Sequence, residues 1–128
     1  MMQNSVKCNF FNEELENFVF NQPTKFVMEG KTKSAETWVE LIDKLCVMLI
    51  KKDAGKMQEF LKEEKKRKNR IPYLSNTEQS IHFVKYLTES GLYLNQKIDA
   101  PRSVKLIRKL LDKFAIQEDS FCLYRTDY

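Results

Sequence analysis

The stretch SAETWVELIDKLCVMLIKK, residues 34–52, carries the strongest secondary-structure signal in this sequence of 128 residues. Large apolar residues recur from Trp38 to Leu49 at steps of three and four, which is the spacing of one face of an α-helix. Ser34 is a suitable N-cap, and Glu36 suits the positive end of a helix dipole. We therefore expect a long amphipathic helix here, with one face in a hydrophobic core.

A second helix is predicted directly after the first. Asp53 and Gly55 interrupt the helical pattern, and Met57, Phe60 and Leu61 then resume it. No apolar residue follows Leu61 until position 71, so we expect this helix to leave the core within one or two turns.

Two later segments also show helical spacing. In residues 77–91, Ile81 and Val84 lie three positions apart, and Gly91 is well placed to end a helix. Residues 100–114 begin with Ala-Pro, which is compatible with the first turn of a helix. The expected buried residues of this last helix are Val104, Ile107, Leu110, Leu111 and Phe114.

Short strands are expected around these helices. In KFVMEGK, residues 25–31, Phe26 and Met28 alternate onto one face and Gly30 supplies a turn. Further strands are predicted in IPYLS (71–75), GLYLNQ (91–96) and SFCLYRT (120–126). This order of elements predicts an α+β fold, with a small sheet of short strands backed by about three to four helices.

The length is that of one domain, residues 1–128, with N-terminal strands in 1–31, a helical middle in 34–70 and a strand–helix–strand end in 91–126. A content of 42% hydrophobic and 31% charged residues is typical of a globular protein. No apolar run approaches the ~20 residues of a membrane span, and the first residues do not resemble a signal peptide. We therefore expect a cytoplasmic protein.

Three cysteines, Cys8, Cys46 and Cys122, are far apart and form no CxxC pair. This spacing argues against a disulfide framework or a zinc site. Each lies among apolar neighbours, so we interpret them as small core residues. We expect no metal and no cofactor.

No catalytic motif is recognisable, and the one histidine, His82, has no evident nucleophile beside it. We therefore expect that the protein is not an enzyme. One alternative remains open, a minimal magnesium-dependent nuclease that uses Glu29 and Lys31 of an E-x-K triplet, with Glu13 or Glu16 supplying the acid.

Positive charge is concentrated in KEEKKRKNR, residues 62–70, where six basic and two acidic residues give a net charge of +4, equal to that of the whole chain. A helix dipole favours one or two cations at its C-terminus, and six exceed that requirement. The excess predicts an anionic partner such as a nucleic acid. The residues expected to contact phosphates are Lys62, Lys65, Lys66, Arg67, Lys68 and Arg70, together with Arg102, Lys105 and Lys109 of the last helix.

Aromatic residues suggest two further interpretations. Tyr73 and Tyr93 are candidates for base stacking, or else tyrosines at the edge of the core. A different hypothesis is a protein-interaction or homo-oligomerisation domain without nucleic-acid contact. Its apolar surface would be formed by Phe10, Phe11, Phe18 and Phe20.

The segments KFVMEGKTKSAETWVELIDKLC, YLS, SGLYLN, SVKLIRKLL with a following Phe, and FCLYR together resemble a module of bacteria and phages. That module is associated with restriction-type and other DNA-handling proteins, and the resemblance spans roughly residues 25–125. Trp38 and Tyr93 match its pattern as core landmarks. The resemblance implies a setting of defence or counter-defence, which also contains small inhibitors of CRISPR effectors. We therefore predict a non-catalytic module that contacts nucleic acid or a nucleoprotein complex through a basic surface.

Overall fold

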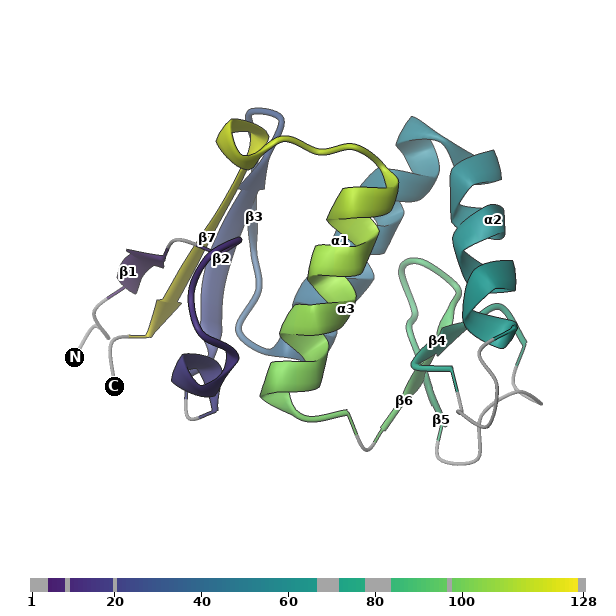
Figure 1. Ribbon diagram of the computed structural model, residues 1–128, viewed down its shortest axis with the longest axis horizontal. Coiled ribbons are helices and arrows are strands. Elements are labelled where there is room, and N and C mark those ends of the chain that lie inside the picture. Colours follow the sequence, from purple (N-terminus) through teal and green to yellow (C-terminus); the bar gives the residue numbers. More distant parts are fainter. Residues whose placement is uncertain are drawn as a thin grey trace. The chain divides into compact units, whose positions relative to one another are not determined.

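The computed structural model describes residues 5–8, 10–19, 21–66, 72–77, 84–96 and 98–126. Helices and short antiparallel strands give an α+β fold, as predicted (Figure 1). The chain divides into two compact units, one formed by Met1–Ile42 with Asp99–Tyr128 and the other by Asp43–Ile98. The division falls within helix α1 (Trp38–Lys52), and each unit contains its own sheet.

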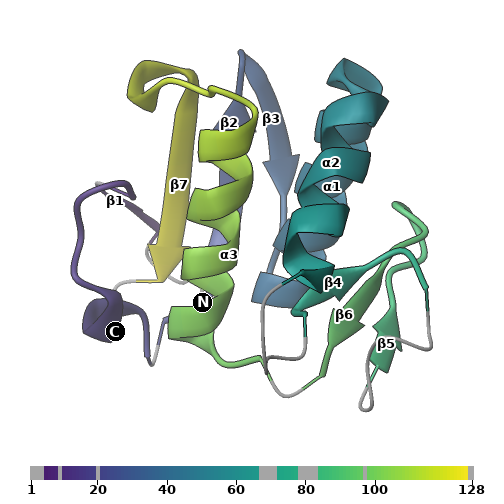
Figure 2. The same ribbon diagram turned by 45° about the vertical axis from the view of Figure 1, so that its right-hand side comes forward.

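A four-stranded antiparallel sheet in the order β1-β7-β2-β3 forms the base of the first unit (Figure 2). Its strands are β1 (Ser5–Cys8), β7 (Phe121–Thr126), β2 (Pro23–Met28) and β3 (Lys31–Ser34). Met28 pairs with Lys31, so β2 and β3 are joined by the two residues Glu29 and Gly30, which have φ values of 49° and 82°. Two consecutive positive φ values are typical of a type I′ hairpin turn, and the predicted turn at Gly30 is confirmed.

An irregularity in β2 changes which residues face the core. Pro23 pairs with Arg125 and Lys25 with Tyr124, so Thr24 is an extra residue in the strand, a β-bulge. Because of this bulge, Pro23 and Phe26 are both buried, although they are three residues apart. Lys25 is exposed on the other face.

An aromatic cluster packs on the buried face of this sheet. Phe10 lies 5.2 Å from Phe121 and 6.2 Å from Phe18, measured between ring centroids. Phe18 ends the 3₁₀ helix η1 (Leu15–Phe18) and makes an edge contact with Trp38, whose indole N–H donates to the Asn21 carbonyl at 3.1 Å. A second 3₁₀ turn, η3 (Glu118–Ser120), leads into β7.

Helix α3 (Ala100–Lys113) packs against η1 (Figures 1 and 2). Asp99 caps the helix by accepting the Arg102 backbone N–H at 2.9 Å. The predicted apolar stripe of α3 is buried in full. Arg108, one of its basic residues, also turns inward, since its guanidinium donates to the carbonyl oxygens of Phe10, at 2.6 and 3.0 Å, and Glu13, at 2.7 Å.

Helix α1 begins later than the sequence suggested. Ser34 is not its N-cap but the last residue of β3, where it pairs with Lys25. Thr37 has the capping role, because its hydroxyl accepts the Glu40 N–H at 3.1 Å and its carbonyl accepts the Leu41 N–H. The hairpin partner therefore extends the strand through residues that local preferences assign to the helix.

The second unit combines the rest of α1 with α2 (Ala54–Lys65) and a three-stranded antiparallel sheet, β4-β6-β5. Its strands are β4 (Leu74–Ser75), β6 (Tyr93–Asn95) and β5 (Val84–Tyr86). Asp53 caps α2 by accepting the Lys56 N–H at 3.1 Å. The core of this unit is formed by Leu45, Leu49, Met57, Phe60, Leu61, Leu74, Leu87, Leu92 and Leu94.

The helix expected over residues 77–91 is wrong where the structure describes this segment. Val84–Tyr86 is a strand paired with β6, and residues 78–83 lie outside the described residues. A turn follows the strand, with Gly91 at φ 78° and its N–H bonded to the Leu87 carbonyl. The buried carboxylate of Asp43 accepts the backbone N–H groups of Glu89 and Ser90 at 3.2 and 2.8 Å, which stabilises the turn rather than a helix.

Arg108→Gln should destabilise the first unit by about 2–4 kcal/mol, because it removes the charged donor of three hydrogen bonds and leaves carbonyl acceptors unsatisfied. Lys105→Gln, on the exposed side of the same helix, is the matched control and should change stability by less than about 0.5 kcal/mol. Urea unfolding followed by circular dichroism measures both values. Equal stability of the two variants would contradict the role assigned to Arg108.

Candidate anion-binding site

The C-terminal half of α2 presents the predicted basic residues to solvent. Lys62, Lys65 and Lys66 are all exposed, and the Lys66 backbone N–H closes the helix by bonding to carbonyls of the last turn. Arg67, Lys68 and Arg70 lie outside the described residues. The described part of this basic stretch is therefore three lysines on one helix end.

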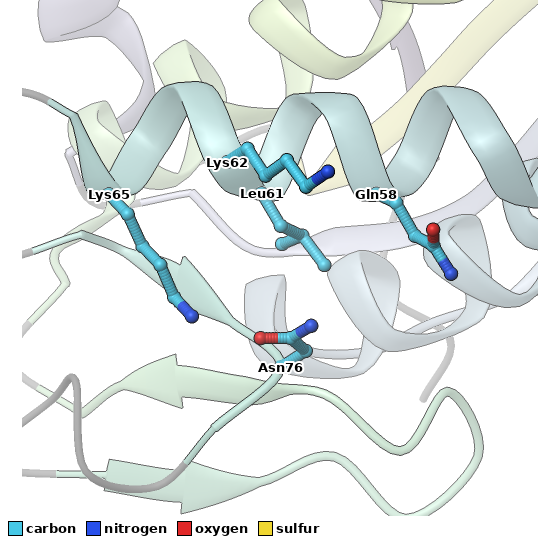
Figure 3. Close-up of a pocket in the computed structure, with 5 residues that line it drawn as sticks. All are labelled: Gln58, Leu61, Lys62, Lys65 and Asn76. Carbon is cyan, nitrogen blue, oxygen red and sulfur yellow. The ribbon is translucent and has the colours of Figure 1, made fainter.

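Two of these lysines border a surface hollow of about 270 Å³. The hollow is lined by Gln58, Leu61, Lys62, Lys65 and Asn76. Figure 3 shows Gln58, Leu61 and Lys65 extending from α2 toward the loop that carries Asn76, while Lys62 lies along the helix. Leu61 is buried at 3% exposure, and the four polar residues are exposed, so polar groups surround an apolar base.

A short hydrogen-bonded turn positions Asn76 opposite the helix. Ser75, the last residue of β4, is fully buried, and its hydroxyl accepts the Thr77 N–H at 3.1 Å. The same hydroxyl donates to the Thr77 carbonyl at 3.0 Å. These bonds fix the backbone on both sides of Asn76, so that its amide borders the hollow while Ser75 points inward.

The lining groups suit an anion. Two ammonium groups and two side-chain amides supply hydrogen-bond donors, and no carboxylate of the described residues lines the hollow. Lys62 and Lys65 are also in the last turn of α2, whose dipole stabilises their charge in the folded protein. A phosphate or carboxylate group matches these donors.

The second predicted basic surface is less available than the sequence indicated. Lys105 and Lys109 are exposed on α3, as is Arg102. The Arg102 guanidinium, however, pairs with its own N-cap, Asp99, at 2.9 Å. Part of the positive charge of α3 is thus offset by the residue that starts the helix.

Tyr73 and Tyr93, the two tyrosines proposed for base stacking, are both half-buried. Tyr93 packs against Tyr86, with ring centroids 5.2 Å apart. Tyr86 is 52% exposed. The sequence predicted a helix at this position and gave no indication that Tyr86 lies beside Tyr93. The alternating pattern of Val84–Tyr86 is the signal that indicates its position.

The phenylalanine surface proposed for protein interaction is not present as predicted. Phe10 and Phe18 are 2% and 0% exposed, and they form the aromatic cluster of the first unit. Phe11 is half-buried with its ring against Phe10, and Phe20 lies outside the described residues. Phe10 and Phe18 are therefore part of the hydrophobic core.

The nuclease alternative requires carboxylates near Glu29. Glu13 is instead ion-paired with Arg125 at 2.5 Å, near the end of β7, whereas the Glu29 N–H bonds to Ser120 at the start of that strand. Glu13 and Glu29 are therefore separated along the strand by roughly 15 Å. Among the described residues, no cluster of His, Cys, Asp or Glu is arranged to hold a metal ion.

Comparison of the chain with protein-family models, curated proteins and solved structures found no match. Within the described ranges, no helix combines the length and the apolar character needed to cross a membrane.

The cysteines differ in their surroundings. Cys46 is completely buried in α1, as predicted for a core residue, whereas Cys122 is half-buried on β7 and is not a core residue. The side chain of Cys8 is outside the described set. Burial, and secondarily the nearby carboxylate of Asp43, raises the pKa of the Cys46 thiol far above its usual range. The thiol therefore stays protonated and unreactive in the folded protein.

This pKa shift predicts a loss of stability in alkaline solution. Above about pH 8.5 the thiol ionises in the unfolded chain but not in the folded one, so the unfolded state binds fewer protons. The free energy of unfolding should then fall by up to ~1.4 kcal/mol per pH unit. Cys46→Ala should remove this contribution to the slope, and Cys122→Ala is the control that keeps it. Urea unfolding at pH 8, 9 and 10 tests this, and equal slopes for wild type and Cys46→Ala would contradict it.

Proposed function

We propose that the protein is a non-catalytic binding module that contacts nucleic acid, free or within a nucleoprotein complex, through the lysines at the end of α2. The observation that carries this proposal is the hollow beside α2, where Lys62 and Lys65 meet the amides of Gln58 and Asn76 and where none of the lining residues that the structure describes is a carboxylate. A phosphate group matches this combination of point charges and hydrogen-bond donors.

The basic residues that continue the chain after α2 extend the same argument. Lys66 directly follows Lys65, and Arg67, Lys68 and Arg70 come next in the sequence. A nucleic-acid backbone presents phosphates at regular short intervals, so one phosphate in the hollow brings its neighbours close to further cations. The contacts expected from this arrangement are to the backbone, which gives affinity without strong sequence preference.

The setting proposed for this activity follows from the sequence pattern. The resemblance of residues 25–125 to a module of DNA-handling proteins favours a role in bacterial or phage defence or counter-defence. The proposed target of the protein in that role is a defence nuclease or a CRISPR-type effector. In this setting, the proposed module would act by occupying a nucleic-acid path or by recruiting a partner. The burial of Phe10 and Phe18 makes two of the four phenylalanines of the alternative, a protein-interaction domain, unavailable to a partner, and this supports the proposal over that alternative.

The double variant Lys62→Gln/Lys65→Gln should weaken binding to duplex DNA or RNA uniformly across sequences. Each phosphate contact that is lost should reduce the slope of log K against log salt by about 0.9 for a duplex. Fluorescence anisotropy with labelled oligonucleotides between ~50 and ~200 mM salt measures the effect.

The matched control is Lys51→Gln/Lys85→Gln, which removes the same charge from two exposed lysines that do not line the hollow. It should retain most of the affinity. The proposal is wrong if the wild-type protein binds neither a naked nucleic acid nor a nucleoprotein from the host at low salt. It is also wrong if both double variants lose affinity equally, since binding would then follow net charge.

A further inference from the structure

The sheet of the first unit has an unusual charge composition. Its four strands contain five basic residues and no acidic residue. The basic residues are Lys7, Lys25, Lys31, Lys33 and Arg125. Arg125 is paired with Glu13, so the remaining positive charge belongs to lysines, all of which are exposed.

Edge protection accounts for some of these lysines but not for all. Lys31 and Lys33 lie on β3, an edge strand, where lysines prevent pairing with other chains. Lys25 lies on β2, which has a neighbouring strand on each side and is not an edge strand. Edge protection therefore does not explain this lysine. A different role has to be sought for Lys25.

Lys25 belongs to a row of three side chains that crosses the sheet. In the strand register, Tyr124 of β7 lies directly opposite Lys25 of β2 on one side and Lys7 of β1 on the other. Directly opposite residues project from the same face of a sheet. The Lys25 ammonium lies 4.5 Å from the centroid of the Tyr124 ring, so the ring presents its π-face at the surface.

The row lies on the face of the sheet opposite to the aromatic core. Phe26 and Leu123, the sequence neighbours of Lys25 and Tyr124, are fully buried on the other face. Tyr124 itself is half-buried, and so are Val27 and Cys122, which are paired with each other one step along the same face. This face therefore carries an aromatic ring between two lysines, with the Lys25 ammonium over the ring.

We propose that this face of the sheet binds single-stranded nucleic acid, with one base stacked on Tyr124 and the flanking phosphates held by Lys7 and Lys25. Aromatic rings stack on bases of any sequence, and positively charged residues beside them follow the backbone. When a base covers the ring, the Lys25 ammonium exchanges its contact with the ring for a phosphate oxygen.

Charge complementarity favours this occupant over others. A second copy of the chain would bring Lys7 and Lys25 against the same lysines, and like charges oppose such a pairing. A duplex keeps its bases stacked on one another, so it leaves the Tyr124 ring without a partner. Glu118 and Asp119 lie in η3, which precedes β7, about 10 Å or more along the chain from the row, and they leave the row itself positive.

The test uses the full chain and a labelled twelve-residue oligo(dT), with oligo(rU) and a hairpin duplex as further probes in fluorescence anisotropy at ~50 mM salt. Tyr124→Leu should weaken single-strand binding by about five- to one-hundred-fold, the range expected for one stacked base. Tyr124→Phe keeps the ring and should stay within about twofold of wild type. Lys25→Gln should lower the salt slope by about 0.7, the value for one single-strand phosphate.

Lys33→Gln is the matched charge control, because Lys33 pairs with Phe26 and so lies on the other face of the same sheet. It should leave single-strand binding unchanged. Circular dichroism melting of each variant checks that the fold is kept, and Lys25→Gln tests the proposal if Tyr124→Leu does not fold. Binding of either single strand, lost in Tyr124→Leu and kept in Tyr124→Phe, supports the proposal.

Two results would overturn it: no single-strand binding by wild type, or equal single-strand affinities of Tyr124→Leu and wild type. The outcome is independent of the α2 site. If only Lys62→Gln/Lys65→Gln loses affinity, the sheet proposal fails and the α2 proposal stands. If only the Tyr124 and Lys25 variants lose affinity, the reverse holds.

Discussion

The guanidinium of Arg108 is the interaction on which the architecture of the first unit depends. By donating to the carbonyls of Phe10 and Glu13, it holds the N-terminal segment against α3 and keeps the Phe10 ring on Phe121 of the sheet. These contacts bury one face of the sheet under helices and aromatic rings. The opposite face, with Tyr124 and Lys25, is covered by none of them, so a half-buried cation indirectly determines which side of the sheet is available for binding.

The sequence predicts elements whose pattern is local and misses those decided by distant partners. Helices α1 and α3 and the turn at Gly30 follow from apolar spacing and turn chemistry that need no knowledge of the rest of the chain. The segment around Val84 fits both helical and extended spacing. Its strand form depends on pairing with β6 and on the turn that Asp43 stabilises from 46 and 47 residues away. Neither interaction can be recognised from the sequence of the segment alone.

The same distinction applies to the candidate sites. Lys62 and Lys65 were predicted because charge excess is visible in sequence, whereas Asn76 joins them only through the packing of α2 on β4. Arg108 lies on the same helix as the predicted basic residues Arg102, Lys105 and Lys109, yet its side chain satisfies backbone carbonyls. Tyr124 lies in a predicted strand but was not assigned to a site, since the row it forms with two lysines arises from strands far apart in the chain.

A modest net charge of +4 limits how much affinity phosphate contacts alone supply. With two or three lysines at each proposed surface, the salt dependence is shallow, and the remaining affinity has to come from contacts that salt does not screen. The amides of Gln58 and Asn76 at the α2 hollow and the ring of Tyr124 on the sheet are groups of this kind. An amide donates hydrogen bonds to acceptors at fixed positions, whereas an aromatic ring stacks on a base of any kind. For a module with a net charge of +4, affinity therefore depends more on the positions of the amides and the aromatic ring beside the lysines than on the number of lysines.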